Sequence, residues 1–253
     1  MTAICYSAGP AMIALLDEEV RGTARFMLSI GGYLDIESVI RFITTGVHAN
    51  PHDRASLYRR PDEYGKWVFA LSSTGALSRR GDRESLEEMA RRRRAEPEAD
   101  LSDLAAGLDD EGRRVFQLLE NRDPDRVAEL IAALPRGIVT EITALDLSRR
   151  DLSALDMRFI LIHGNDDPVI PETQSVMLAA ALQRADLFIL DSIQHVDPGP
   201  SGLGDKLKLL AAVHELLRQR DIIRPPEGPT GESPLRSASD EPVAGPTRPP
   251  GMM

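Results

Sequence analysis

Three residues of the types used in nucleophilic catalysis follow apolar segments of this 253-residue chain. Ser7 follows a brief apolar start, Asp167 follows the run 159–162, and His195 follows the run 186–190. A hydroxyl, a carboxylate and an imidazole in this order, each just after a strand, can carry out acyl transfer, because the imidazole takes the serine proton and the carboxylate fixes the imidazole tautomer. We therefore expect Ser7 to be a nucleophile, His195 its general base and Asp167 the residue that orients His195.

The first ten residues, MTAICYSAGP, predict a strand, a tight turn and a helix that Pro10 can open. Such a turn exposes Ser7 at the carboxyl edge of a sheet, and the backbone N–H of Ala8 is the expected donor to an oxyanion. Small neighbours such as Gly9 suit the close approach of strand and helix. Cys5 is expected to be buried in the apolar strand and unreactive.

Other titratable residues near these positions have competing interpretations. Asp166 is an alternative to Asp167 as the acid of a triad, and His163 lies at the end of an apolar run. His48 and His52 have metal-ligand spacing, but Pro51 interrupts the helix that this spacing needs. We therefore expect no metal and no cofactor.

Short apolar runs alternate with segments of helical periodicity, which is typical of an α/β fold with a mostly parallel sheet covered by helices. The predicted strands lie near Ala3 and at 24–30, 157–163 and 186–190, and the predicted helices at 11–20, 173–183 and 203–219. Between them the chain is long, charged and helical in pattern, with predicted helices at 36–42, 84–94, 113–121, 126–134 and 137–145.

These patterns divide the chain into four parts. Residues 1–34 hold the first strand, the turn with the nucleophile, a helix and the next strand; residues 35–153 form an inserted helical cap. Residues 154–223 form a C-terminal core with the acid and histidine turns. The last segment, 224–253, is rich in proline and poor in large apolar residues, so we expect it to be disordered.

At Ser7, Asp167 and His195 the sequence resembles the α/β-hydrolase superfamily, in particular its serine esterase, lipase and peptidase-like members with a helical cap. The specific part is HGNDDPVIP at 163–171, where the acid of that family lies three residues after the glycine, which is Asp167 here. The resemblance also implies that His163 supports the acidic turn through hydrogen bonds. The resemblance implies hydrolysis of an ester, thioester or amide of a small-molecule acyl substrate. Because Ser7 lies so early, the strands that precede the elbow in that family are missing, and the chain looks like the C-terminal half of the fold.

Composition excludes several other classes of protein. A net charge of −10 and an aromatic content of 4% argue against nucleic-acid binding. The single cysteine fits a reducing compartment, and no apolar stretch is long enough to span a membrane, so we expect a cytoplasmic protein. The alternatives to a hydrolase are an N-terminally truncated, non-catalytic remnant and an α/β domain that binds a small ligand or a partner. An unpaired edge at the first strand also predicts a homodimer through this edge.

Overall fold

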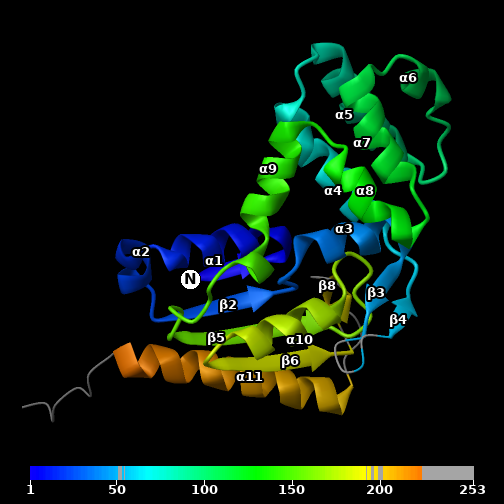
Figure 1. Cartoon of the computed structure of the whole chain (residues 1–253). Coiled ribbons are helices and arrows are strands. Elements are labelled where there is room, and N and C mark those ends of the chain that lie inside the picture. The colour runs from blue at the N-terminus through cyan, green and yellow to red at the C-terminus, as the bar shows by residue number, and fades with distance from the viewer. Residues whose placement is uncertain (51–52, 54, 192, 195–196, 199–201, 224–253) are drawn as a thin grey trace, which may run out of the picture.

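The structure, a computed structural model, describes residues 1–50, 53, 55–191, 193–194, 197–198 and 202–223. Its centre is a parallel four-stranded sheet in the order β1-β2-β5-β6 (Figure 1). These strands are β1 (Thr2–Ile4), β2 (Phe26–Ile30), β5 (Arg158–Gly164) and β6 (Ala185–Leu190). The predicted α/β class with a parallel sheet is confirmed.

The burial of each strand explains its sequence. β5 lies between β2 and β6 and is buried along almost its whole length, which accounts for its continuous apolar run. β2 alternates between buried and half-buried residues. β1 pairs only with β2, with Ala3 opposite Ser29, so it forms one edge of the sheet among the described residues.

Helices cover the two faces of the sheet unequally. On one face, α1 (Ala8–Leu16) and α10 (Glu172–Ala181) enclose a core with residues such as Met12, Met27 and Phe159. On the other face, α11 (Leu203–Ile223) contacts β5 and β6, and the buried cluster contains Ile162, Leu190 and Ala212. Figure 1 shows α11 and α1 on opposite sides of the strands.

The chain between β2 and β5 forms a helical insertion beyond the ends of the strands (Figure 1). Its elements are α3 (Ile36–Thr45), β3 (Val47–Ala49), β4 (Ser56–Tyr58), α4 (Glu63–Ser73), α5 (Arg80–Ala95), α6 (Ser102–Ala106), α7 (Asp110–Glu120), α8 (Val127–Ala132) and α9 (Arg136–Leu145). These helices share one apolar core, which includes Phe42, Trp67 and Leu118. The two ends of the insertion lie together, because the Ser148 N–H donates to the Leu34 carbonyl at 3.0 Å.

The helix predicted at 11–20 is interrupted. Asp17 has extended backbone angles, and its carboxylate accepts hydrogen bonds from the N–H groups of Glu19 and Val20. It therefore ends α1 and caps a separate short helix, α2 (Glu18–Thr23). The segment 224–253, for which we predict disorder, lies outside the described residues.

Candidate active site

The turn after β1 is built around Cys5. Cys5 has a φ of 57°, and among the described residues it is the one non-glycine residue with a positive φ. It comes directly after the last residue of β1 and begins the 3-10 turn Cys5–Ser7 that leads into α1. A non-glycine residue in this conformation stores backbone strain, and such residues cluster at functional sites. Cys5 is half-buried, so the expectation that it would be enclosed within the strand is wrong.

Ser7 lies at the end of that turn, where its hydroxyl is engaged with the backbone. Its Oγ donates to the Ile4 carbonyl at 2.7 Å and accepts from the Ile4 N–H at 3.0 Å. These two bonds close the end of β1. A serine nucleophile needs its proton directed at a base, so the arrangement favours a structural role for this hydroxyl.

The predicted oxyanion donor is also used internally. The N–H of Ala8 donates to the Cys5 carbonyl, and Ala8 is fully buried. Because this N–H is already bonded within the turn, the structure does not favour it as a donor to a substrate, and the oxyanion role of Ala8 stays a prediction. Tyr6 lies in the first turn after β1, where a backbone N–H has no acceptor within the helix. The Tyr6 N–H replaces the Ala8 N–H as the candidate donor.

The acidic turn after β5 positions Asp167. Its side chain is fully buried, and Oδ1 accepts hydrogen bonds from the N–H groups of Val169 at 2.8 Å and Ile170 at 3.0 Å. Oδ2 lies 3.4 Å from Nε2 of His163. His163 itself contacts the Ile170 carbonyl at 2.9 Å and Ser175 Oγ at 2.6 Å, so it supports this turn as predicted.

Asp166 and Asp167 point in different directions. The Asp166 side chain is 80% exposed, whereas that of Asp167 is 0% exposed. Arg59, at the end of the β3–β4 hairpin, holds the turn from outside by donating to the carbonyls of Asp167 and Asn165, at 3.1 Å each. It also pairs with Glu172 at 2.8 Å. The insertion and the acidic turn are therefore tied together, and the Asp167 carboxylate faces the interior.

His195 lies outside the described residues. Its role as general base, and its place relative to Cys5, Ser7 and Asp167, stays a prediction. The structure brings the turn after β1 and the turn after β5 to the same edge of the sheet, because all four strands are parallel.

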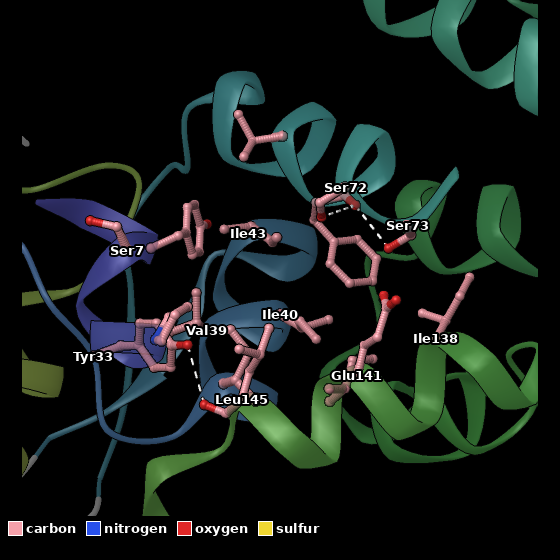
Figure 2. A pocket seen from close by; sticks show the side chains of 16 residues that line it. Ser7, Tyr33, Val39, Ile40, Ile43, Ser72, Ser73, Ile138, Glu141 and Leu145 are labelled. Atoms are coloured by element: carbon pink, nitrogen blue, oxygen red, sulfur yellow. Dashed lines mark hydrogen bonds between the residues drawn. The ribbon is translucent and has the colours of Figure 1, made fainter. Parts of the chain in front are cut away.

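Next to the elbow lies an apolar cavity of about 330 Å³ between α1, α3, α4 and α9. Figure 2 shows Ser7 and Tyr33 at one end of it and Ser73, Ile138 and Glu141 at the other. Among the described residues that line this cavity, Glu141 is the one charged residue. The remaining wall is formed by apolar and aromatic side chains, among them Tyr6, Ile36, Val39, Ile40, Ile43, Phe69, Ile142 and Leu145.

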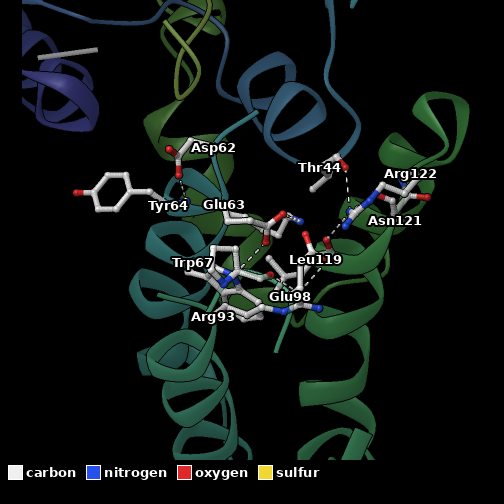
Figure 3. A network of polar contacts seen from close by, with 12 residues as sticks. Thr44, Asp62, Glu63, Tyr64, Trp67, Arg93, Glu98, Leu119, Asn121 and Arg122 are labelled. Carbon is white, nitrogen blue, oxygen red and sulfur yellow. Dashed lines mark hydrogen bonds and ion pairs between the residues drawn. The ribbon is translucent and has the colours of Figure 1, made fainter. Parts of the chain in front are cut away.

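A second cavity, of about 470 Å³, is polar. Lys66, 2% exposed, donates to Glu63 at 2.7 Å, and Trp67 Nε1 donates to the other Glu63 oxygen at 3.2 Å (Figure 3). Arg122 donates to the carbonyl of Thr44 at 3.1 Å, which joins the ends of α7 and α3. Burial lowers the pKa of Lys66 while its bond to Glu63 opposes that change. The two bonds of Glu63 lie within α4, so of these contacts it is the one from Arg122 that joins two helices of the insertion.

A metal site is not apparent in the described ranges, which contain no cluster of three His, Cys, Asp or Glu side chains suited to an ion. His48 packs its ring edge-on against Phe42 at 5.5 Å, and His52 lies outside the described residues. None of the described helices is both long and apolar enough to cross a bilayer.

Searches against known proteins identify structural rather than sequence relatives. No protein-family model matches the chain, and no curated sequence matches it at a significant level. The chain is structurally similar to α/β-hydrolase-fold proteins. One is an α/β hydrolase fold protein from Nakamurella multipartita, with 16% identity, a TM-score of 0.33, and coverage of 87% of this chain and 68% of that one.

Two further structures show similar values. A meta-cleavage product hydrolase from Pseudomonas fluorescens IP01 has 17% identity and a TM-score of 0.38, with 88% of this chain and 64% of that one covered. An N-acyl homoserine lactone degrading enzyme has 17% identity and a TM-score of 0.35, with 86% and 65% covered. The chain therefore spans slightly less than two thirds of the length of these two proteins.

Proposed function

We propose that the protein is a hydrolase that cleaves an ester, thioester or amide through an acyl-enzyme, with Cys5 as the nucleophile. The observation that carries this proposal is the strained backbone of Cys5, directly after β1 and at the start of a helix. Such a turn projects a nucleophile at the carboxyl edge of a sheet. The proposal moves the nucleophile from Ser7 to Cys5, because the Ser7 hydroxyl is engaged with Ile4.

The chemistry follows from the groups around this turn. The Cys5 thiol gives its proton to the imidazole of the predicted base, His195, and the resulting thiolate attacks the acyl carbon and forms a C–S bond, while the π electrons of the carbonyl move to its oxygen. The Tyr6 N–H and the positive end of the helix stabilise that oxyanion. The intermediate then expels the alcohol, thiol or amine, which takes a proton from the imidazolium of the predicted base, His195. Asp167 orients this imidazole in the proposal.

Deacylation uses the same groups. A water molecule gives a proton to the neutral His195 imidazole as its oxygen attacks the thioester carbon. The C–S bond breaks, the carboxylic acid leaves, and the thiol of Cys5 is restored. No cofactor enters either half of the reaction.

The test uses turnover of p-nitrophenyl butyrate by the full chain, together with intact-mass analysis. Because the chain contains one cysteine, an acyl or iodoacetamide adduct on sulfur can be assigned to Cys5. We expect Cys5→Ala to abolish turnover and both adducts. Ser7→Ala is the matched control, which should keep the adducts and most of the turnover.

Two outcomes would contradict this assignment. Turnover and fluorophosphonate labelling that survive Cys5→Ala but not Ser7→Ala would restore Ser7 as nucleophile. Binding of the ester without turnover and without any adduct would support the second candidate, a small-ligand-binding domain, which the apolar cavity also favours.

A further inference from the structure

A carboxylate interrupts the apolar face that α9 turns toward the cavity. The apolar lining residues of this helix follow helical spacing: Ile138, Ile142 and Leu145. Glu141 lies on the same face, three residues after Ile138, and also lines the cavity. A helix face that packs against a core normally holds apolar residues at each of these positions. Packing of α9 therefore does not account for a carboxylate here.

The carboxylate of Glu141 is accessible and unengaged. Glu141 is exposed, so a molecule that enters the cavity from solvent can reach it. Within the described residues it makes no hydrogen bond and no ion pair. Glu63, which lines the polar cavity, is different, because its two oxygens accept from Lys66 and Trp67. The charge of Glu141 is therefore available to a ligand.

The lining at this end of the cavity offers acceptors rather than donors. Ser72 and Ser73 of α4 lie at the same end as Glu141 (Figure 2). Both hydroxyls donate to the Phe69 carbonyl, at 2.8 Å and 2.9 Å. Because each hydroxyl proton is used in this way, only oxygen lone pairs remain for a ligand. Together with the carboxylate, they favour a group that is rich in N–H donors.

The rest of the cavity sets the other requirements on a ligand. Ser7, two residues after Cys5, lines the opposite end (Figure 2). The wall between the two ends is apolar, with Val39, Ile40 and Ile43 of α3 among its residues. The volume of about 330 Å³ lies at the small end of the range for small-molecule sites. A ligand that fills this space needs an apolar body between its two ends.

We propose that Glu141 selects ligands whose apolar body ends in a primary ammonium group. A primary ammonium carries a positive charge and three N–H donors, so it can bind the carboxylate and a serine lone pair at once. For the proposed hydrolase, the substrate class is an ester, thioester or amide with this ammonium at the far end of its acyl chain. The inference rests on the proposed function for the hydrolysis of such a ligand but not for its binding.

The test measures binding of two probes of the same shape, 4-phenylbutan-1-amine and 4-phenylbutan-1-ol. A primary amine is protonated at pH 7, so the probes carry an ammonium or a hydroxyl at the same place. Dissociation constants come from isoleucine-methyl NMR titrations, in which Ile36, Ile40 and Ile43 report occupancy of the cavity. Because Glu141 is exposed, we expect Glu141→Gln to weaken the amine about fivefold relative to the alcohol.

Glu129→Gln is the matched control. It removes the same charge from an exposed position on α8 that does not line the cavity, so it should leave the ratio of the two dissociation constants unchanged. In wild-type protein with ¹³C-labelled glutamate, the amine but not the alcohol should shift the Cδ resonance of Glu141.

Several results would refute the proposal. An unchanged ratio in Glu141→Gln would show that the carboxylate does not select the ammonium. Equal changes in both variants would assign the preference to the net charge of −10 rather than to Glu141. The proposal also fails if neither probe binds, or if the Cδ resonance of Glu141 does not move at saturation with the amine.

Failure of this proposal and failure of the proposed hydrolysis are distinguishable. Neither probe contains an ester, thioester or amide bond, so the preference for the ammonium is measured whether or not Cys5 is a nucleophile. Conversely, loss of adducts in Cys5→Ala tests hydrolysis without reference to Glu141.

Discussion

Among single residues, two tyrosines, the half-buried Tyr6 and the buried Tyr33, should control the response of the fold to alkaline pH. Burial raises the pKa of both Tyr6 and Tyr33. Above about pH 10 the unfolded chain loses these protons while the folded chain keeps them. The contribution of the two tyrosines to the free energy of unfolding is therefore fully present below that pH and falls as the pH rises. Urea midpoints between pH 8 and 11 should therefore decline in wild type, and less steeply in Tyr6→Phe.

The control for this titration is Tyr58→Phe, at an exposed position. It should leave the slope of stability against pH unchanged. A decline of equal steepness in wild type and Tyr6→Phe would contradict the prediction.

The sequence could predict the neighbourhood of the proposed nucleophile but not which residue of the turn to propose. Small residues flank two candidates at the same spacing: Ala3 and Ser7 around Cys5, and Cys5 and Gly9 around Ser7. The deciding fact is where β1 ends, and boundaries are the least reliable part of a prediction from sequence. The alternative centred on Cys5 was available as a signal, since it places a small residue two positions before the nucleophile, Ala3 in β1, and another two positions after it, Ser7 at the end of the turn.

No sequence pattern predicts two further residues of the candidate site, Arg59 at the acidic turn and Tyr6 as the candidate oxyanion donor. Arg59 is over a hundred positions from the acidic turn that it binds, so its role depends on how the hairpin folds back. Asp167 is different, because its turn is local: the backbone groups that it accepts from lie two and three residues away.

At the scale of elements, a buried carboxylate joins two helices of the insertion. Asp82 in α5 accepts from the N–H groups of Asp109 at 2.9 Å and Gly112 at 3.1 Å, at the start of α7. Asp82→Ala should destabilise the protein by roughly 2 kcal/mol, because it leaves two amide donors unpaired. The measurement is the free energy of unfolding in urea.

Asp110→Ala is the comparison for this variant. Asp110 is exposed in the first turn of α7, just as Asp82 lies in the first turn of α5. Its replacement therefore removes the same charge from the start of a helix but does not remove the two hydrogen bonds that Asp82 accepts. Its effect should stay near 0.5 kcal/mol. Equal losses in the two variants would show that charge, rather than hydrogen bonding, is the relevant property of Asp82.

Sequence analysis misses β4 and α4 because their patterns of apolar and polar residues do not match those expected for a strand or a helix. All three residues of β4 are exposed, so its sequence lacks the alternation that marks a strand. In α4 the polar Lys66 is buried, because Glu63 pairs with it inside the insertion. A pattern of apolar and polar residues cannot predict such a burial. The central strands and the long amphipathic helices, by contrast, lie within a few residues of their predicted ends.

For the whole molecule, the exposed parts of the sheet predict self-association. β1 is an edge of the described sheet, and Ile4 is 45% exposed there. Unpaired edges favour pairing with a second chain. We expect light scattering to show a dimer or larger species, and Ile4→Lys to shift it toward monomer.

Leu210→Lys provides the comparison, since Leu210 is exposed on α11 across the sheet from α1. It should affect association less than Ile4→Lys does. A monomer in wild type at every concentration would contradict the predicted edge pairing, and a larger effect of Leu210→Lys would assign the contact to the helix.

The hydrogen bond between Ser148 and Leu34 has a mechanical consequence. Both ends of the insertion leave the sheet at this one place, where Gln174 of α10 also accepts from the N–H groups of Leu34 and Asp35. At a second place the acidic turn is bound by Arg59, through the carbonyls of Asn165 and Asp167, and by the Asp62 N–H, which donates to the Pro168 carbonyl. The insertion is therefore fastened to the core at two separate places, one on each side of the helices α3, α4 and α9 that form walls of the cavity.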